Sequence, residues 1–534
     1  MATSLPVRSR WHILFGLLAA AAVGLGIGFR LWNIAREPLW LDEAYSAYAA
    51  SKSFGFLWGI VPQYETHPPF YYSLLKVWTL IFGDSLAALR ALGALGGIGA
   101  IGAGVLAARG IGRMIHLAPA KCAVLMSAAA ILLALGTLPI EMTREVRPYP
   151  LMALVYATII GLLFRTARGI SNGGRLWCRS YAAYLVLLAL LLWLHNLGIL
   201  YAGAAGLALL ILCLRRSWTR QDWLALVLGH LLVLAIWLPA LMILSEQAPT
   251  WVQSTWLRFS LSWTLPWTVT RLFITPQLTS LTSALLLIIL AWTGLGGRSQ
   301  GMRTASALLI LMLLPVLLSI AISALIAPVF IPRTLAAVAI PGMLLLALGV
   351  AAPRTVAMRI LAMIALAVIL IEMIALDIHQ RRIRPSEDWY PVLAWLEPRF
   401  RQGDLVVAYP NEGALAFRFA QRDRNMSMAT KPIPTDMPAL NAGPGAWNPT
   451  GSRGVVSLSK ARLEQIVDTP DLQRPPTIWL LRQGAWAYDK GDNFLHALER
   501  DRVRTDRIFI MPIEIIGLRR KDLPPVASAQ QAKP

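Results

Sequence analysis

The chain has 534 residues, of which 57% are hydrophobic and 14% charged, with a mean hydropathy of +0.58 and a formal net charge of +21. A soluble domain carries about 25% charged residues, so this composition excludes an ordinary soluble protein and indicates a polytopic membrane protein. The basic residues are spread between apolar runs and form no basic face, which argues against a nucleic-acid partner and favours positive-inside topology. Three cysteines without CxxC or Cys/His spacing predict neither a disulfide scaffold nor a cysteine metal site.

Apolar runs of the length needed to cross a bilayer recur along roughly the first 376 positions. The first run is expected to be an uncleaved membrane span rather than a cleaved signal peptide, because Arg30 follows it directly. The runs together predict eleven membrane helices, at residues 11–33, 86–108, 118–140, 149–165, 180–195, 197–214, 223–244, 278–296, 304–327, 331–351 and 355–376.

The loops between these helices sort into two sets by charge. One set is rich in arginine and includes Arg109, Arg113, Arg165, Arg168, Arg354 and Arg359. The other set holds most of the acids, namely Glu37, Asp42, Glu43, Glu65, Asp84, Glu141, Glu145 and Glu246. The positive-inside rule places the arginine-rich set and the N-terminus in the cytoplasm, as expected for a multi-pass protein of a bacterial cytoplasmic (inner) membrane.

Residues 68–83, PPFYYSLLKVWTLIFG, form a further apolar segment that hydropathy alone would count as a span. A full crossing here would put every later arginine-rich loop on the outer face. The segment is also short, contains Lys76 and is rich in Tyr and Trp. We therefore expect an interfacial helix, which makes residues 34–85 one large extracytoplasmic loop.

The composition changes near residue 380, where strands are expected at 404–409, 477–481 and 507–518 and helices near 411–422, 458–468 and 491–500. This pattern predicts a transmembrane domain over residues 1–379 and a soluble α/β domain over 380–520. Eleven crossings from a cytoplasmic N-terminus place the soluble domain on the extracytoplasmic side. The last residues, 521–534, are expected to be a disordered tail.

Asp42 and Glu43 follow the first predicted span, in the stretch EPLWLDEAYSAYAA. Two adjacent carboxylates can be solvated loop acids beside a helix end. An acid at the membrane face and walled by aromatic side chains can instead have a shifted pKa and act as a general base. It would then take the proton from an acceptor hydroxyl while a lipid-borne leaving group departs.

His67 and Glu65 lie in the sequence ETHPP, at the entry to the predicted interfacial helix. His67 fits a helix-entry residue at the level of the headgroups, a phosphate contact or a metal ligand. Asp42, Glu43 and His67 could together hold a hard divalent cation, although their spacing matches no recognised metal motif. No cofactor is expected with certainty.

Arg144, Arg147 and Tyr149 crowd into one short outer turn, REVRPYP, and Arg333 follows Pro332 at the outer end of the tenth helix. Two guanidinium groups at the membrane surface can hold a phosphate bidentately, or Arg144 and Arg147 can pair with Glu145 inside the turn. Arg333 can reach the headgroups or point inward as another phosphate ligand.

Two further sequence features are weaker candidates for a functional or packing role. His195 and Asn196 form a tight outer turn that could line a cavity or cap the neighbouring helices. Gly93 and Gly97 have the spacing of a helix-packing motif. They do not form a phosphate loop, because no strand precedes them and no Lys-Ser/Thr follows.

The stretches EPLWLDEAYSAYAA, THPPFYYSLLKVWTLIFGDSLAALRALGAL, REVRPYPLMAL and FIPRTLAAVAIPGMLLLALG occur in the order found in one family. Over roughly residues 30–350 the chain resembles bacterial glycosyltransferases of the GT-C fold. It looks most like the family-39-like group related to protein O-mannosyltransferases and the lipid A aminoarabinose transferase. The resemblance implies a polyprenyl-phosphate-linked sugar donor, a hexosyl or pentosyl transfer with inversion, and a glycan, lipid or protein acceptor on the outer side.

The resemblance also implies roles for individual residues. Asp42 matches the acid of the family's first loop, the expected catalytic base, and Glu43 stands beside it. His67 matches the position after that loop that helps to organise the site. Arg144, Arg147 and Arg333 match positions expected near the lipid phosphate.

Two other classes remain as alternatives from the sequence. A lipid-linked glycan flippase or transporter could share the composition and the arginine-lined turns, and inverted repeats would favour it. An O-antigen-type polymerase or ligase also uses polyprenyl-linked sugars. Such an enzyme is expected to have a large outer loop in mid-chain, whereas the 245–277 loop is modest.

Overall fold

The computed structural model describes residues 7–214, 218–254, 259–262, 264–297, 299–383, 385, 387–440, 446–447 and 454–524. The last ten residues of the predicted disordered tail therefore lie outside the described residues. The chain divides into two compact units. We call residues 1–34, 67–245 and 257–383 the membrane unit, and residues 35–66, 246–256 and 384–534 the C-terminal unit.

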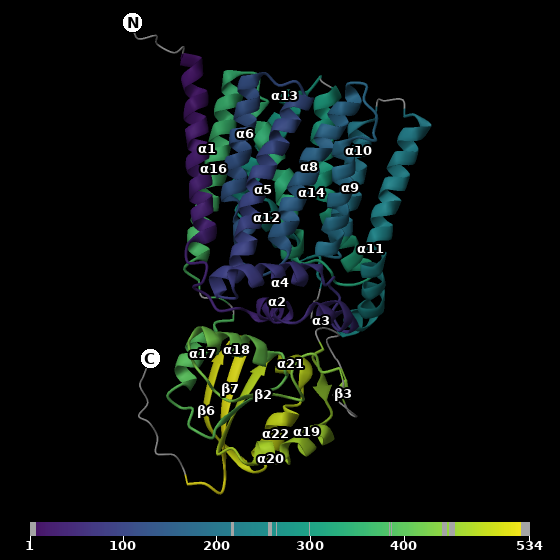
Figure 1. The fold of residues 1–534 in the computed structure, drawn as a ribbon. Coiled ribbons are helices and arrows are strands. Elements are labelled where there is room, and N and C mark those ends of the chain that lie inside the picture. The colour runs from purple at the N-terminus through teal and green to yellow at the C-terminus, as the bar shows by residue number, and fades with distance from the viewer. Residues whose placement is uncertain are drawn as a thin grey trace. The chain divides into compact units, whose positions relative to one another are not determined.

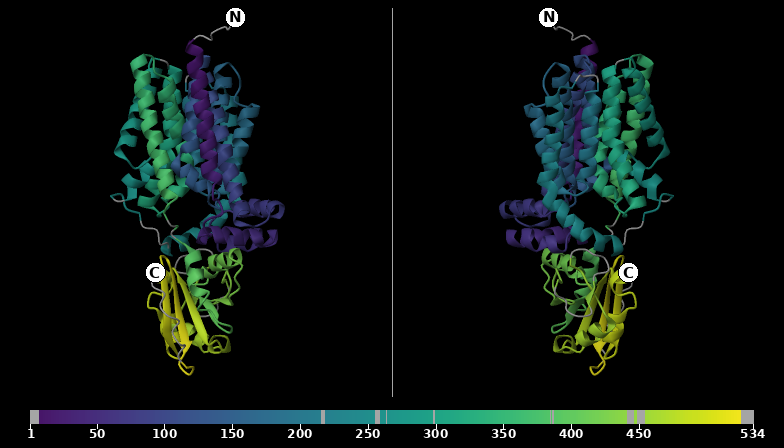
Figure 2. Two further views of the ribbon diagram at one scale, coloured as in Figure 1. Left: turned by 90° about the vertical axis from the view of Figure 1, so that its left-hand side faces the viewer. Right: turned by 90° about the vertical axis from the view of Figure 1, so that its right-hand side faces the viewer.

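Helices make up the membrane unit, and the long apolar ones among them run side by side (Figures 1 and 2). They are α1 (Val7–Leu31), α5 (Leu86–Met114), α6 (Pro119–Leu135), α7 (Thr137–Thr143), α8 (Tyr149–Ser171), α9 (Arg179–Leu194), α10 (Gly198–Leu212), α11 (Arg220–Ser254), α12 (Thr264–Phe273), α13 (Leu278–Leu295), α14 (Ser299–Leu325), η2 (Pro332–Val338), α15 (Ala339–Ala351) and α16 (Val356–Gln380). A helix lies at each of the eleven predicted spans.

The lengths of these helices agree with a polytopic membrane protein. Among the described residues, seven helices are long and apolar enough to cross a membrane, or eight if the bent pair α6–α7 forms one span. Four shorter apolar helices accompany them. Within the segment Pro332–Ala351, every residue from 334 to 351 is buried, so η2 and α15 lie in the interior of the helical bundle. The predicted 245–277 loop is wrong in part, because it contains the end of α11 and the whole of α12.

The predicted helix at 118–140 is broken, and α6 and α7 meet at an angle of 55°. Pro139 explains the break, because it has no N–H to donate to the carbonyl of Leu135 one turn earlier. The guanidinium of Arg30, which is only 1% exposed, supplies hydrogen bonds to the end of α6 at this break. It donates to the carbonyl oxygens of Ala134 at 2.7 Å and Leu133 at 3.2 Å, at the end of α6.

Replacing Arg30 with methionine is expected to destabilise the membrane unit. The substitution keeps an unbranched apolar stem but leaves two buried carbonyl groups without their charged donor, at a cost of about 2–4 kcal/mol. The thermal unfolding midpoint in detergent measures this effect. Arg113→Met at the exposed end of α5 is the matched control, and equal midpoints for the two variants would rule out the proposed role of Arg30.

Helix α4 (Phe70–Phe82) lies across the end of the membrane helices, as both figures show. Its 13 residues extend about 20 Å, too little to cross a hydrocarbon core of about 30 Å. Tyr71, Tyr72 and Leu75 are buried, whereas Leu80, Ile81 and Phe82 are exposed. The length and the one-sided burial fit an interfacial helix, which stays a prediction.

The C-terminal unit contains a five-stranded mixed sheet and short helices. They are α2 (Leu41–Ser51), α3 (Phe54–Gly59), η1 (Val61–Gln63), α17 (Trp389–Leu396), β1 (Leu405–Ala408), α18 (Gly413–Asp423), β2 (Thr430–Pro432), β3 (Ala446–Trp447), β4 (Ser457–Leu458), α19 (Lys460–Val467), α20 (Pro470–Gln473), β5 (Thr477–Gln483), α21 (Ala485–Tyr488), α22 (Asn493–Glu499), β6 (Arg502–Ile510) and β7 (Ile513–Arg520). The strand order is β2-β1-β5-β7-β6, with β1 parallel to β2 and β5 and the other pairs antiparallel.

The single strand predicted at 507–518 is wrong. The segment forms part of a hairpin in which β6 and β7 are antiparallel, with Met511 and Pro512 between them. Proline has no N–H for a strand ladder and therefore suits the turn. The strands predicted at 404–409 and 477–481, and the three predicted helices, are confirmed. The fold class, a polytopic helical membrane protein with a C-terminal α/β domain, is also confirmed. The boundary at residue 379 stays a prediction.

Alternating strand residues build a core on each face of this sheet. Val407, Leu480 and Leu518 pack with Leu463 and Phe494 of α19 and α22 on one face. On the other face Trp395 of α17 contacts Trp479, with ring centroids 5.9 Å apart.

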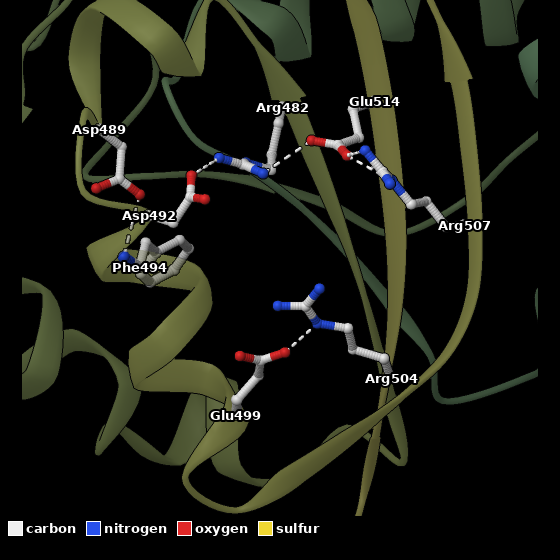
Figure 3. A network of polar contacts seen from close by, with 8 residues as sticks. All are labelled: Arg482, Asp489, Asp492, Phe494, Glu499, Arg504, Arg507 and Glu514. Carbon is white, nitrogen blue, oxygen red and sulfur yellow. Dashed lines mark hydrogen bonds and ion pairs between the residues drawn. The ribbon is translucent and has the colours of Figure 1, made fainter.

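An ion-pair network crosses the sheet, with Arg482 and Glu514 largely buried and Arg507 and Asp492 exposed (Figure 3). Glu514 of β7 accepts from Arg482 of β5 at 2.8 Å and from Arg507 of β6 at 2.6 Å. Arg482 also pairs with Asp492. Arg482 and Glu514 stand opposite each other in the β5–β7 register, so the network joins three adjacent strands.

Candidate functional site

The predicted site residues divide between the two compact units, and we describe each unit by itself. Asp42, Glu43 and Glu65 belong to the C-terminal unit. The predicted residues of the membrane unit are His67, Arg144, Arg147, Tyr149 and Arg333.

Helix α2 carries both members of the acid pair in its first turn. Alanines promote the helix, and carboxylates near its N-terminus interact favourably with the helix dipole. Asp42 is 4% exposed and Glu43 is 1% exposed. The carboxylate of Glu43 accepts a hydrogen bond of 3.4 Å from the backbone N–H of Trp40, the N-cap residue. This contact gives Glu43 a structural role at the start of α2.

Glu387, which the sequence did not single out, fixes the start of the same helix. Its Oε2 accepts from the backbone N–H of Leu41 at 2.8 Å and from the side-chain amide of Gln483 at 2.9 Å. Gln483 is the last residue of β5. Near the other end of α2 the hydroxyl of Tyr48 donates to the carbonyl oxygen of Met437. Helix α2 is therefore held against the sheet domain at both ends.

Replacing Glu387 with alanine is expected to loosen the first turn of α2. The change removes the shared acceptor of Leu41 and Gln483, and each lost partner costs about 1–3 kcal/mol when the remaining group stays buried. Amide hydrogen exchange in the peptide covering residues 40–52 should become faster. Glu387→Gln keeps an oxygen acceptor and should exchange almost as slowly as the wild type. Equal protection in the alanine variant and the wild type would contradict this role.

Glu65 and two tyrosines form a second polar group in the C-terminal unit. The hydroxyls of Tyr45 and Tyr64 are hydrogen-bonded at 3.1 Å, and their rings meet edge to face. Glu65 is buried and accepts from Thr66 Oγ1 at 3.3 Å. Burial raises the pKa of Tyr64, and the hydrogen bond from Tyr45 partly opposes this. Tyr64 is therefore neutral at physiological pH and serves as a hydrogen-bonding group.

Close helix packing fixes the arginine-bearing turn of the membrane unit. A Cβ added at Gly97 of α5 would lie 1.9 Å from Cγ2 of Thr143, the last residue of α7. A Cβ added at Gly93 would lie 3.0 Å from the carbonyl oxygen of Thr143. The two glycines therefore let the turn that carries Arg144 and Arg147 lie directly against α5, as predicted for a packing motif.

His67, Arg147, Tyr149, His195 and Arg333 form what we call the histidine–arginine cluster. The rings of His67 and His195 meet edge to face with centroids 4.8 Å apart, and those of Tyr149 and His195 are 6.0 Å apart. The guanidinium carbon of Arg147 lies 5.7 Å from the ring centre of Tyr149. Arg147 is 4% exposed and His195 is 5% exposed.

Burial lowers the pKa of His195 well below its usual value, and the nearby charges of His67, Arg147 and Arg333 lower it further. Nδ1 of His195 accepts a hydrogen bond of 3.1 Å from the backbone N–H of Leu197. The ring is therefore neutral and carries its proton on Nε2. His195 is also the C-cap residue of α9. The sequence predicted that His195 would either line a cavity or cap a neighbouring helix, and the capping role is confirmed.

Arg144 has a different environment from Arg147. Its guanidinium donates to the carbonyl oxygen of Asn33 at 3.1 Å, where the chain leaves α1. Arg90 of α5 makes a similar bond of 3.0 Å to the carbonyl oxygen of Ile34. These contacts anchor Arg144 and Arg90 to the segment that leaves α1.

A metal site gains no support from the arrangement of side chains. Among the described residues, no group of three or more His, Cys, Asp or Glu side chains is spaced to hold a metal ion. A cation site made of Asp42, Glu43 and His67 stays a prediction.

Sequence reasoning underrated His195 and missed Glu387. A histidine between two apolar helices is a visible signal, but its electrostatic interactions with Arg147 and Arg333 join segments far apart in the chain. Glu387 lies in an ordinary polar linker, and no local pattern distinguishes it from its neighbours.

No family model matches the chain, and no curated protein matches its sequence. Solved structures do match its fold. The apo ArnT of Cupriavidus metallidurans aligns with a TM-score of 0.57 and 14% identity over 96% of this chain and 98% of its own. ArnT of the same organism bound to undecaprenyl phosphate aligns with a TM-score of 0.54 and 14% identity over 95% and 98%. The chain therefore has the GT-C fold of these structures and is a multi-pass integral membrane protein.

Proposed function

We propose that this protein is a membrane glycosyltransferase that moves a sugar from a polyprenyl-phosphate donor to an acceptor hydroxyl, with inversion at the anomeric carbon. The main support is the burial of Arg147 beside His195 and Arg333 at the end of a GT-C helical bundle. Fixed cations in a weakly screening environment stabilise charge that develops on a phosphate leaving group. ArnT, which shares the fold, has been solved with undecaprenyl phosphate.

Asp42 is the proposed general base of this reaction. The bond between the anomeric carbon and the phosphate oxygen breaks while the acceptor oxygen attacks from the opposite face. Asp42 takes the acceptor's proton, and the phosphate monoester leaves on its lipid. The proposal leaves Glu43 its contact with the backbone N–H of Trp40 at the start of α2.

The proposal is tested by supplying the purified protein in nanodiscs with synthetic polyprenyl-phosphate sugars. Consumption of one donor and release of polyprenyl phosphate are expected, and glycan profiling of a deletion strain then identifies the acceptor. A lipid-linked glycan flippase would move the donor across a membrane without consuming it. A polymerase or ligase would instead require a glycan chain linked through a diphosphate.

We further propose that the acid-rich loops face outward from the inner membrane. In a cysteine-free background, Asp84→Cys before α5 should react with a membrane-impermeant maleimide in intact spheroplasts. Asn172→Cys, at the opposite end of the parallel helix α8, should react only after the membrane is permeabilised. The reverse pattern would invert the topology.

A further inference from the structure

His195 is a buried titratable group of the histidine–arginine cluster, and the proposed reaction assigns it no role so far. It lies in the turn between α9 and α10, near the start of α8 and the η2 segment. Its Nδ1 is occupied by the backbone N–H of Leu197 at 3.1 Å. The ring orientation is therefore fixed by its own turn, independently of any ligand.

The opposite nitrogen of the ring has an unused donor. Nε2 of His195 is buried and has no hydrogen-bond acceptor among the residues that the structure describes. An N–H group buried without an acceptor is unfavourable, and such groups in folded proteins call for an explanation. A bound ligand that supplies the acceptor is one such explanation.

The charges around His195 specify what kind of ligand this would be. The groups that act electrostatically on it are His67, Arg147 and Arg333, all of them basic, and Tyr149 is the other ring in contact. A cation would be repelled by this set. A ligand that is anionic and rich in oxygen acceptors matches the positive charge of these groups and can accept from the Nε2–H group.

We propose that His195 is a binding residue for the phosphate of the lipid donor, with Nε2–H donating to a phosphate oxygen that Arg147 and Arg333 also bind. This inference rests on the proposed function and adds a specific contact to it. A neutral donor supplies a hydrogen bond without burying a third positive charge, which would be costly to desolvate. The contact also does not depend on protonating the ring.

The experiment measures binding of undecaprenyl phosphate to the full-length protein in phosphatidylcholine nanodiscs. His195→Asn keeps an acceptor for the Leu197 N–H and removes the donor at the Nε2 position. His195→Gln does the opposite, because its amide nitrogen reaches the Nε2 position. The asparagine variant should bind about tenfold to a hundredfold more weakly, as expected for a lost hydrogen bond to a charged group. The glutamine variant should bind within about threefold of the wild type.

The pH dependence gives a second readout. Wild-type affinity should stay constant between about pH 7 and 8.5, where the phosphate monoester is already largely dianionic. A positively charged His195 would instead make affinity fall as pH rises, because the ring would lose its proton. Unfolding midpoints of the two variants show whether either change merely destabilises the turn.

The outcomes separate the two proposals. Equal affinity of His195→Asn and the wild type for undecaprenyl phosphate would overturn the role of His195 and leave the proposed function intact. An equal loss of affinity for phosphatidylglycerol, titrated in parallel, would also overturn it, because the site would then hold ordinary lipid headgroups. Failure of the wild type to bind undecaprenyl phosphate at all would overturn both proposals.

Discussion

Replacing Asp42 with asparagine is expected to abolish most sugar transfer while the protein stays folded and inserted. Asparagine has nearly the same shape, so it should fit the buried position at the start of α2. It cannot take a proton from the acceptor hydroxyl at neutral pH, and loss of a general base typically costs about 10²–10⁴ in rate. Donor consumption by purified protein in nanodiscs measures the effect.

Glu43→Gln is the matched control for this change. Glutamine retains an oxygen that can accept from the N–H of Trp40, and it is a usual residue at the third position of a capped helix. We expect activity within a few-fold of the wild type. Normal turnover by Asp42→Asn, or an equal loss in both variants, would show that Asp42 is not the base.

Replacing Arg147 with methionine is expected to produce the second large loss. The side chain is buried, and in the proposed reaction its guanidinium stabilises charge on the departing phosphate. Removing one donor of this kind typically lowers kcat by about 10²–10³. Binding of undecaprenyl phosphate should weaken in parallel, because Arg147 would hold the phosphate in both ground state and transition state.

Two variants separate charge from geometry at this position. Arg147→Lys keeps the charge but lacks the planar fork of donors, so we expect a partial recovery. Arg175→Met removes an exposed arginine from the loop between α8 and α9 and should leave turnover unchanged. Wild-type kinetics in Arg147→Met would exclude this residue from the phosphate site.

The helical architecture was predictable because membrane helices require sequence features that are easy to recognise. Each span needs about 20 apolar residues, and the arginine content of the loops alternates along the chain. The same charge argument predicted that residues 68–83 would not cross, and α4 does lie across the bundle. The strands at 405–408 and 477–483 were visible for a similar reason, since both are short runs of β-branched and aromatic residues.

The structure differs from the predicted helices and strands at two places, and each difference is caused by a single proline that does not change the hydrophobic pattern. The break between α6 and α7 follows from Pro139, and the apolar pattern continues through it unchanged. The β6–β7 turn follows from Pro512 inside an apolar run that otherwise reads as one strand. In both places the missing N–H of proline outweighs a continuous hydrophobic pattern.

The candidate residues were partly predictable, because acids and arginines at helix ends of a membrane protein are uncommon enough to notice. By itself the sequence determined the positions and order of the apolar helices, the α/β character of the C-terminal part and the identity of Asp42, Arg147 and Arg333 as candidates. Only the tertiary structure decided that His195 lies among Arg147, Arg333 and His67, and that Glu387 and Gln483 hold the start of α2. Hydropathy and charge are sums over neighbouring residues, whereas these contacts join segments as many as 346 residues apart and form only when the helices and strands pack.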